Sequence, residues 1–173
     1  MNQTAQETVI EPRDIPWEPR VKPKNVPREI THTITLVPSE HLYSLWFEVQ
    51  DYLAPAVARA NGRWNLECLY AAIVSGHQHL WLAFDKDKHI DGVWTTEFID
   101  YPCKRMLAIQ FLGGSKITDW GWEMIDRTSS WAADNGCSGI EATGRAGFWK
   151  WLEQDGFTRS YTVYEKELDH HGR

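Results

Sequence analysis

The chain has 173 residues, which is enough for one domain of ordinary size with a substantial core. Apolar residues make up 42% of it and aromatic residues 13%, a composition typical of a folded protein. Its 18 basic and 24 acidic residues give a formal net charge of −6, and no Lys/Arg cluster offsets this locally. The composition therefore argues against a protein that binds DNA or RNA.

Residues 1–29 differ from the rest of the chain. Prolines recur every three or four residues, at positions 12, 16, 19, 23 and 27, among five basic and five acidic residues. Proline at this density excludes helix and central strand, so an extended, Pro-rich N-terminal arm is predicted. We expect the arm to dock on neighbouring proteins through its apolar residues, which are Ile10, Ile15, Trp17 and Val21.

Hydrophobic periodicity predicts the first elements of the domain that starts at residue 30. A strand is expected over 30–37, a helix over 39–53 with Ser39 as its N-cap, and a second helix over 65–75. Strands over 79–84 and 90–98 form a hairpin, and a strand over 105–112 ends at Gly113-Gly114.

The second half of the domain alternates helices and strands. A long helix begins at Thr118 or Asp119 as N-cap, runs to residue 133 and stops at Asn135-Gly136. A strand over 138–143, a short helix over 148–154 and a last alternating strand over 160–168 follow, before a polar tail of residues 169–173. This order predicts an α/β domain over 30–168, with a mixed sheet covered by helices on both faces.

The cysteines and tryptophans add less specific information. Cys68, Cys103 and Cys137 are widely spaced, which predicts buried free thiols in a reducing compartment rather than a zinc site or a disulfide framework. No apolar run approaches the ~20 residues that span a bilayer, and the N-terminus lacks an apolar signal segment, so a cytoplasmic protein without membrane contact is expected. The ten tryptophans hint at a partner surface, because Trp is enriched at the centres of interfaces as well as in cores.

The order of elements resembles the fold of the GNAT superfamily of N-acetyltransferases. Three motifs resemble those that mark the same points in that family: Gly92 in the second hairpin strand, Asn135-Gly136-Cys137 before Ile140-Glu141, and Gly156-Phe157 after the last helix. The run Gly144-Arg145-x-Gly147-Phe148-Trp149 also resembles phage-encoded GNAT-like proteins found among virion genes. The resemblance implies a GNAT-like, acyl-CoA N-acyltransferase fold.

The family holds the pyrophosphate of acetyl-CoA with the turn [QR]-x-x-G-x-[GA], where backbone N–H groups and the helix dipole face the phosphates. Aligned on the end of the long helix, this turn falls on 116–121 and puts Asp119 at the middle glycine. A carboxylate a few ångströms from a pyrophosphate costs about 4 kcal/mol at an effective dielectric of 20. An alternative is the turn Gly113-Gly114-Ser115-Lys116, which could bind an anion but precedes the helix.

The resemblance also implies a general base and, often, a tyrosine in the fourth helix that protonates the departing thiolate. The tyrosine position falls on Leu152, which cannot transfer a proton. Glu97 and Glu141, both on strands, are the candidate bases if the chain is active, although strand carboxylates are commonly only solvated.

Other polar groups carry weaker signals. His77, His79 and His89 share the hairpin, but no carboxylate or cysteine is spaced to complete a metal site, so none is expected. Arg145 is either a recognition residue for a carboxylate or phosphate or a structural residue that holds its turn.

Two functions follow. In the first, the chain is a non-catalytic assembly or binding protein without a cofactor, a component of a phage virion made in the host cytoplasm. It would bind other protein subunits, in an oligomer or larger assembly, through the arm and a Trp-rich surface. In the second, it is an active acetyl-CoA-dependent N-acetyltransferase that uses residues 113–116 for the phosphates and Glu97 or Glu141 as base.

Overall fold

The computed structural model of the chain describes residues 28–144 and 146–168. The predictions for the arm residues Ile10, Ile15, Trp17 and Val21, for Arg145 and for the tail of residues 169–173 lie outside this part of the chain.

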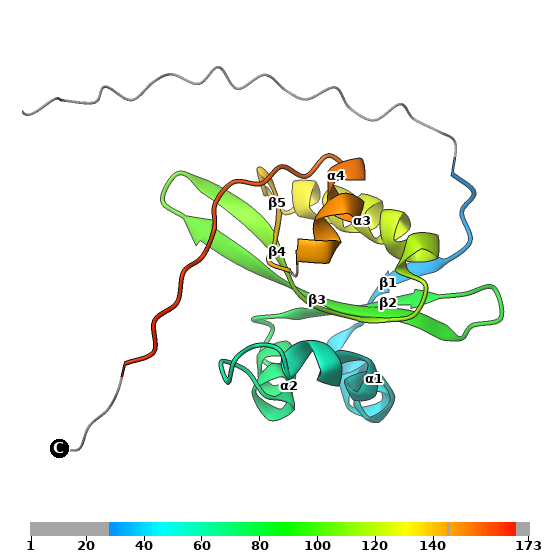
Figure 1. Cartoon of the computed structure of the whole chain (residues 1–173). Coiled ribbons are helices and arrows are strands. Elements are labelled where there is room, and N and C mark those ends of the chain that lie inside the picture. Colours follow the sequence, from blue (N-terminus) through cyan, green and yellow to red (C-terminus); the bar gives the residue numbers. More distant parts are fainter. Residues whose placement is uncertain (1–27, 145, 169–173) are drawn as a thin grey trace, which may run out of the picture.

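A five-stranded mixed sheet forms the centre of the domain (Figure 1). Its strands lie in chain order: β1 (Thr33–Leu36), β2 (His79–Phe84), β3 (Ile90–Tyr101), β4 (Lys104–Gly114) and β5 (Gly139–Ala142). The first four pair antiparallel, and β4 pairs with β5 in parallel. The parallel pair requires a crossover, which the long helix between the two strands provides.

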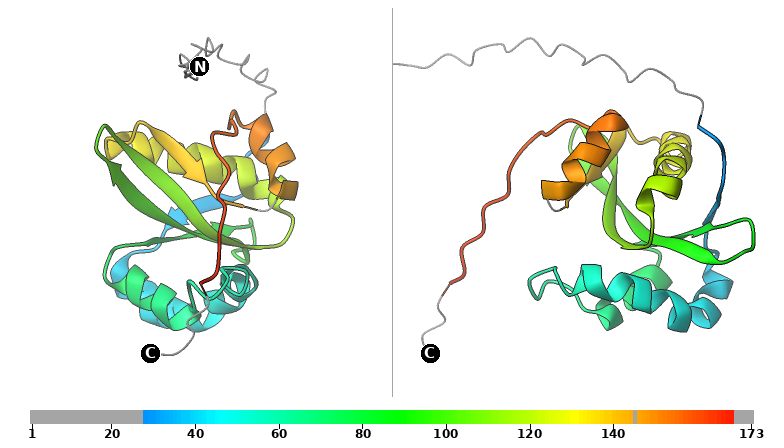
Figure 2. Two further views of the ribbon diagram at one scale, coloured as in Figure 1. Left: turned by 60° about the vertical axis from the view of Figure 1, so that its left-hand side comes forward. Right: turned by 45° about the vertical axis from the view of Figure 1, so that its right-hand side comes forward.

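Helices cover both faces of the sheet, as predicted (Figures 1 and 2). The helices α1 (Leu42–Val57) and α2 (Leu66–Val74) lie on one face, and α3 (Ile117–Asp134) and α4 (Trp149–Gln154) on the other. Single 3-10 turns, Ser39–His41 and Ala146–Phe148, precede α1 and α4.

Each face of the sheet has its own core. Aliphatic residues from α1, α2 and the sheet, such as Val49, Leu53 and Leu69, fill one side. Tryptophans dominate the other side, where Trp94 stacks between Trp81 and Trp120 at centroid distances of 6.0 and 5.8 Å. Every tryptophan with a described side chain is buried or half-buried, and the half-buried ones are Trp46, Trp64, Trp122, Trp131 and Trp151. The Trp-rich partner surface stays a prediction.

A buried carboxylate fixes the point where the chain enters the domain. Glu123 on α3 accepts hydrogen bonds from the backbone N–H groups of Thr31 and His32, at 2.8 and 3.1 Å. Just before them, Arg28 pairs with Asp155 at 3.0 Å and lies over the ring of Trp122. The described chain is therefore tied to α3 and α4 at its first residue.

Both predicted N-caps are wrong. Ser39 lies inside a 3-10 turn, and its side chain does not cap a helix. The long helix starts at Ile117, with Lys116 as N-cap in the left-handed conformation (φ 48°), so Asp119 lies within its first turn. The early start is held by Trp120, whose indole N–H donates to the carbonyl of Ser115 at 2.7 Å.

The last predicted strand does not form either. Residues 158–168 are extended but make no ladder, and the side chains of Tyr161, Val163, Tyr164 and Leu168 are exposed. The segment leaves α4 and runs past the β3–β4 hairpin toward the α1–α2 loop (Figure 1). The alternating pattern predicts compatibility with a sheet, but a strand also needs a paired edge.

The predicted burial of the cysteines is wrong as well. Cys68 on α2 and Cys103 in the β3–β4 turn are exposed, and Cys137 is half-buried. All three are free thiols.

Candidate functional site

The sheet opens where β4 and β5 separate. Their parallel pairing ends at Ile109 and Ala142. On the other side of β4 the register with β3 shifts at the same place, so that Gln110 and Phe111 together oppose Thr95. Such a β-bulge bends its strand, and this one lies where the pairing of β4 with β5 ends.

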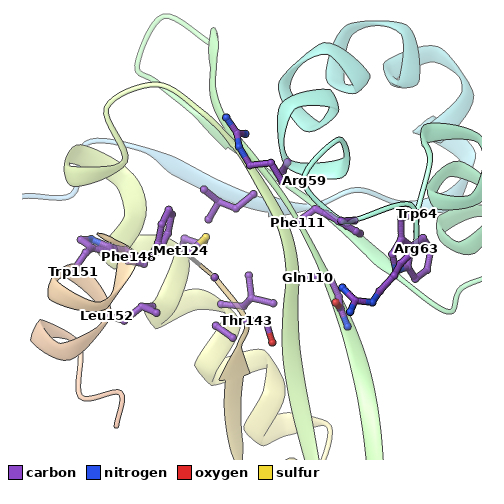
Figure 3. A pocket seen from close by; sticks show the side chains of 16 residues that line it. Arg59, Arg63, Trp64, Gln110, Phe111, Met124, Thr143, Phe148, Trp151 and Leu152 are labelled. Carbon is purple, nitrogen blue, oxygen red and sulfur yellow. The ribbon is translucent and has the colours of Figure 1, made fainter. Parts of the chain in front are cut away.

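A cavity of about 510 Å³ occupies this opening (Figure 3). Trp64 and Phe111 line it on the α1–α2 side of the sheet, and Met124, Phe148 and Leu152 on the α3–α4 side. The wall is mainly apolar. Its charged groups are two arginines, Arg59 and Arg63, and no Asp or Glu is among the described residues that line it.

Both arginines come from the loop that follows α1. The loop turns at Asn61 and Gly62, which have φ of 50° and 72°, values that Asn and Gly tolerate best. Arg63 pairs with Glu165 of the extended C-terminal segment, while Arg59 donates to the carbonyl of Pro55. No local sequence pattern marks either arginine as a site residue, because both enter the site only once α1 packs against β4.

The four residues proposed to hold phosphates, Gly113, Gly114, Ser115 and Lys116, lead directly from the end of β4 into α3, with Lys116 as its N-cap. The expectation that this turn stands several residues before the helix is therefore wrong. A Cβ on Gly113 would overlap the backbone carbonyl of Tyr52 on α1, and one on Gly114 would overlap the carbonyl of Asp91. The N–H of Ser115 already donates to that same carbonyl at 3.0 Å. Close packing against α1 and β3 accounts for both glycines.

The first turn of α3 is filled by side chains. Asp119 is exposed there and accepts a hydrogen bond from the hydroxyl of Thr118 at 3.1 Å, while its own N–H donates to the carbonyl of Lys116. The indole ring of Trp151 from α4 lies directly against the Cα of Gly121, where a Cβ would overlap it. The open face of this glycine is therefore occupied.

Glu97 and Glu141 lie in one row across three strands. Glu97 is opposite Ala108, which is opposite Glu141, so the two Cα atoms are separated by two strand spacings of about 4.8 Å each. Gln110 donates to Glu97 at 3.2 Å, and the Tyr101 hydroxyl donates to Glu141 at 3.0 Å. This hydrogen bond raises the pKa of Tyr101, because the neighbouring carboxylate disfavours the phenolate.

Two further predictions concern proton transfer and metal binding. Leu152 is buried beside the cavity, where the family's tyrosine is expected. His79 begins β2, whereas His89 precedes β3 at the far end of the same hairpin and contacts Asp85, so these histidines do not converge. Within residues 28–144 and 146–168, no group of three or more potential ligands could hold a metal ion.

Solved structures of acetyltransferases resemble this arrangement. An aminoglycoside acetyltransferase from an uncultured soil metagenomic sample aligns with a TM-score of 0.59 at 14% identity, over 80% of this chain and 96% of its own. A putative acetyl transferase from Pyrococcus furiosus gives 0.60 at 15%, over 79% and 99%. Glucosamine-6-phosphate N-acetyltransferase from Arabidopsis thaliana gives 0.57 at 12%, over 81% and 100%.

The chain has the GNAT acetyltransferase fold. Identities this low show the fold alone and carry no activity with them. No protein-family model and no curated protein sequence matches the chain. None of the helices in the described part of the chain is long and apolar enough to cross a membrane.

Proposed function

We propose that the chain is a non-catalytic GNAT-like protein, which uses the acetyltransferase scaffold for binding and assembly. The observation that carries this proposal is the first turn of α3, where the fold would have to hold a pyrophosphate. Asp119 places a carboxylate in that turn, and the Trp151 ring covers Gly121. The carboxylate of Asp119 repels the negative charge of a pyrophosphate, and the Trp151 ring occupies the space beside Gly121. Each therefore obstructs a pyrophosphate independently of the other.

The proton chemistry supports the same proposal. The buried Leu152 offers no proton to a departing thiolate. Glu97 and Glu141 each accept a hydrogen bond from a neighbouring side chain, so each carboxylate has a hydrogen-bond partner within the protein even when no substrate is bound.

Titration with acetyl-CoA tests the proposal. A ligand at 100 times its dissociation constant stabilises the folded protein by about 2.7 kcal/mol, which a thermal-shift assay resolves. We expect no shift with the wild-type chain at millimolar acetyl-CoA, and a gain of binding in the double variant Asp119→Gly/Trp151→Ala. Clear stabilisation of the wild type that Asp119→Gly does not improve would contradict the proposal.

An active N-acetyltransferase is the second candidate, and the cavity between β4 and β5 favours it. In this case residues 113–116 would hold the cofactor, with Glu97 or Glu141 as base. Release of free CoA thiol in the presence of a panel of amines measures this activity. Glu97→Gln and Glu141→Gln identify the base, since only loss of the true base removes the activity.

We further propose that the non-catalytic protein is a component of a phage particle, because residues 144–149 resemble virion-associated proteins and because the chain has a Pro-rich arm. The arm residues Ile10, Ile15, Trp17 and Val21 would contact other subunits of a phage particle, with Arg145 as a further contact. Co-purification of the chain with particles through a density gradient tests this setting, and recovery only in the soluble fraction contradicts it.

A further inference from the structure

The charged side chains that line the cavity between β4 and β5 are positive, although the chain as a whole is negative. The whole chain carries a formal net charge of −6. The cavity wall nevertheless contains Arg59 and Arg63 and, among the described residues, no carboxylate. Charge of one sign in a cleft with apolar walls attracts ligands of the other sign, so the wall selects for an anion.

The rest of the wall selects for an apolar body. Trp64 and Phe111 lie on one side and Leu112, Met124, Phe148 and Leu152 on the other, as Figure 3 shows for most of them. The volume of about 510 Å³ lies within the range of roughly 300–1,000 Å³ that holds one small organic molecule. An apolar wall with a few converging polar groups is the usual form of such a site.

The protein itself places a carboxylate on one of these arginines, Arg63. Glu165, in the extended segment after α4, forms an ion pair with Arg63. Tyr161 of the same segment lies beside Tyr101 at the β3–β4 turn. These contacts show that Arg63 can hold a carboxylate in its present conformation. The side chains of Arg63 and Glu165 are 54% and 44% exposed, so solvent screens their attraction and the pair can be displaced.

We propose that the cavity binds a small organic acid with an apolar body and one carboxylate, and that Arg63 holds the carboxylate while Glu165 competes for the same guanidinium. The planar guanidinium matches a carboxylate through two parallel hydrogen bonds. Arg59 adds positive charge at the same wall. A monocarboxylate carries no pyrophosphate, so neither Asp119 nor the Trp151 ring obstructs it. The proposal therefore does not require the first turn of α3 to hold a phosphate.

Calorimetric titration of the full chain with decanoate, below its micellar concentration, tests the site. Decanol is the matched uncharged probe. We expect decanoate to bind at least about tenfold more tightly than decanol, because a hydrogen bond to a charged group contributes that much or more. Arg63→Gln should weaken decanoate binding by the same factor and leave decanol binding unchanged.

Glu165→Gln should tighten decanoate binding by about two- to fivefold, since it removes a competing surface ion pair. Glu167→Gln is the matched control: it removes one acidic charge from the same segment without touching the pair with Arg63, and it should leave binding unchanged. Circular dichroism checks that each variant is folded.

Three results would overturn the proposal: no binding of decanoate, equal affinity for decanoate and decanol, or wild-type affinity in a folded Arg63→Gln. Unchanged affinity in Glu165→Gln, or an equal effect of Glu167→Gln, overturns the competition by Glu165.

Discussion

At the scale of single residues, Gly113 is constrained by packing rather than by a ligand. A Cβ at this position would overlap the backbone carbonyl of Tyr52, and backbone cannot move aside as a flexible side chain can. Gly113→Ala should therefore destabilise the fold by about 1–3 kcal/mol or more, as overpacking does. Urea unfolding measures the change.

Gly147→Ala is the control for Gly113, because nothing lies within 4 Å of its added Cβ. It should shift the unfolding midpoint far less. If both substitutions have the same effect, close packing of β4 against α1 does not explain Gly113.

His79 should give the fold a pH dependence. Burial lowers the pKa of its imidazole below the ordinary 6.5, and the nearby Arg105 lowers it further, while the hydrogen bond to Thr96 opposes this. The unfolded chain then takes up a proton at higher pH than the folded one, so stability falls as pH drops through 6.5 and levels off below the folded pKa.

The substitution His79→Phe tests this pH dependence, because a ring is kept against Phe98 and Trp131 but the titration is lost. As pH is lowered, the free energy of unfolding of the wild type should fall relative to that of the variant. The exposed His77 is the control, and His77→Gln should follow the wild type. Parallel pH profiles for the wild type and His79→Phe would contradict the prediction.

At the scale of elements, sequence periodicity predicted the existence and type of nearly all helices and strands, and β2 with its bounds. Local patterns carry this information, since each element must bury one face. The end of α3 at Asn135 was predicted for the same reason, because a helix stop is a local signal. The start of α3 was missed because a side-chain hydrogen bond accompanies it, from the indole N–H of Trp120 to the carbonyl of Ser115, and N-cap preferences do not predict this contact.

The segment 160–168 shows that a local alternating pattern does not by itself produce a strand. Its alternation is a genuine local preference, but the structure gives it no strand partner among the described residues. Deletion of residues 158–173 should accordingly change the free energy of unfolding by less than about 1 kcal/mol, since the described residues 158–168 contribute exposed side chains and the solvent-screened pair of Arg63 with Glu165. Thermal and urea unfolding measure it.

Phe157 marks the boundary of that dispensable segment, because it packs into the Trp-rich core. A truncation that also removes Phe157 is the matched control and should cost about 3 kcal/mol or more. A large loss of stability on deletion of 158–173 alone would show that the segment is part of the fold.

At the scale of the whole molecule, the fold follows from the sequence more completely than the site does. The order of elements was sufficient for the mixed sheet and its two helical layers. The cavity was not predictable in this way, because Arg59, Phe111 and Leu152 lie far apart in the chain and meet only across the separated strands. The bulge at Gln110, which lies where β4 and β5 separate, was not predicted either, whereas the position of Asp119 near the start of α3 was visible in the sequence.

The arm is the part of the molecule on which the assembly hypothesis depends. The described chain is anchored from Arg28 onward by Asp155, Trp122 and Glu123, so the domain has its own attachment for the start of β1. Deletion of residues 1–27 should therefore leave the unfolding temperature unchanged while it abolishes assembly. Light scattering after size-exclusion chromatography measures the mass, and a thermal melt measures the fold.

Substitutions in the full-length chain distinguish the role of the arm from the role of Arg28, which anchors the start of the domain. Trp17→Ser/Val21→Ser should reduce assembly as the deletion does, because it removes the apolar contacts but keeps the length and charge of the arm. Arg28→Ala should instead lower the stability modestly, by about 1–2 kcal/mol or less, and leave assembly intact, since it removes an ion pair and a cation–π contact at the surface of the domain. If the chain without residues 1–27 assembles as the full chain does, the contacts between subunits lie on the folded domain, and the proposed role of the arm is wrong.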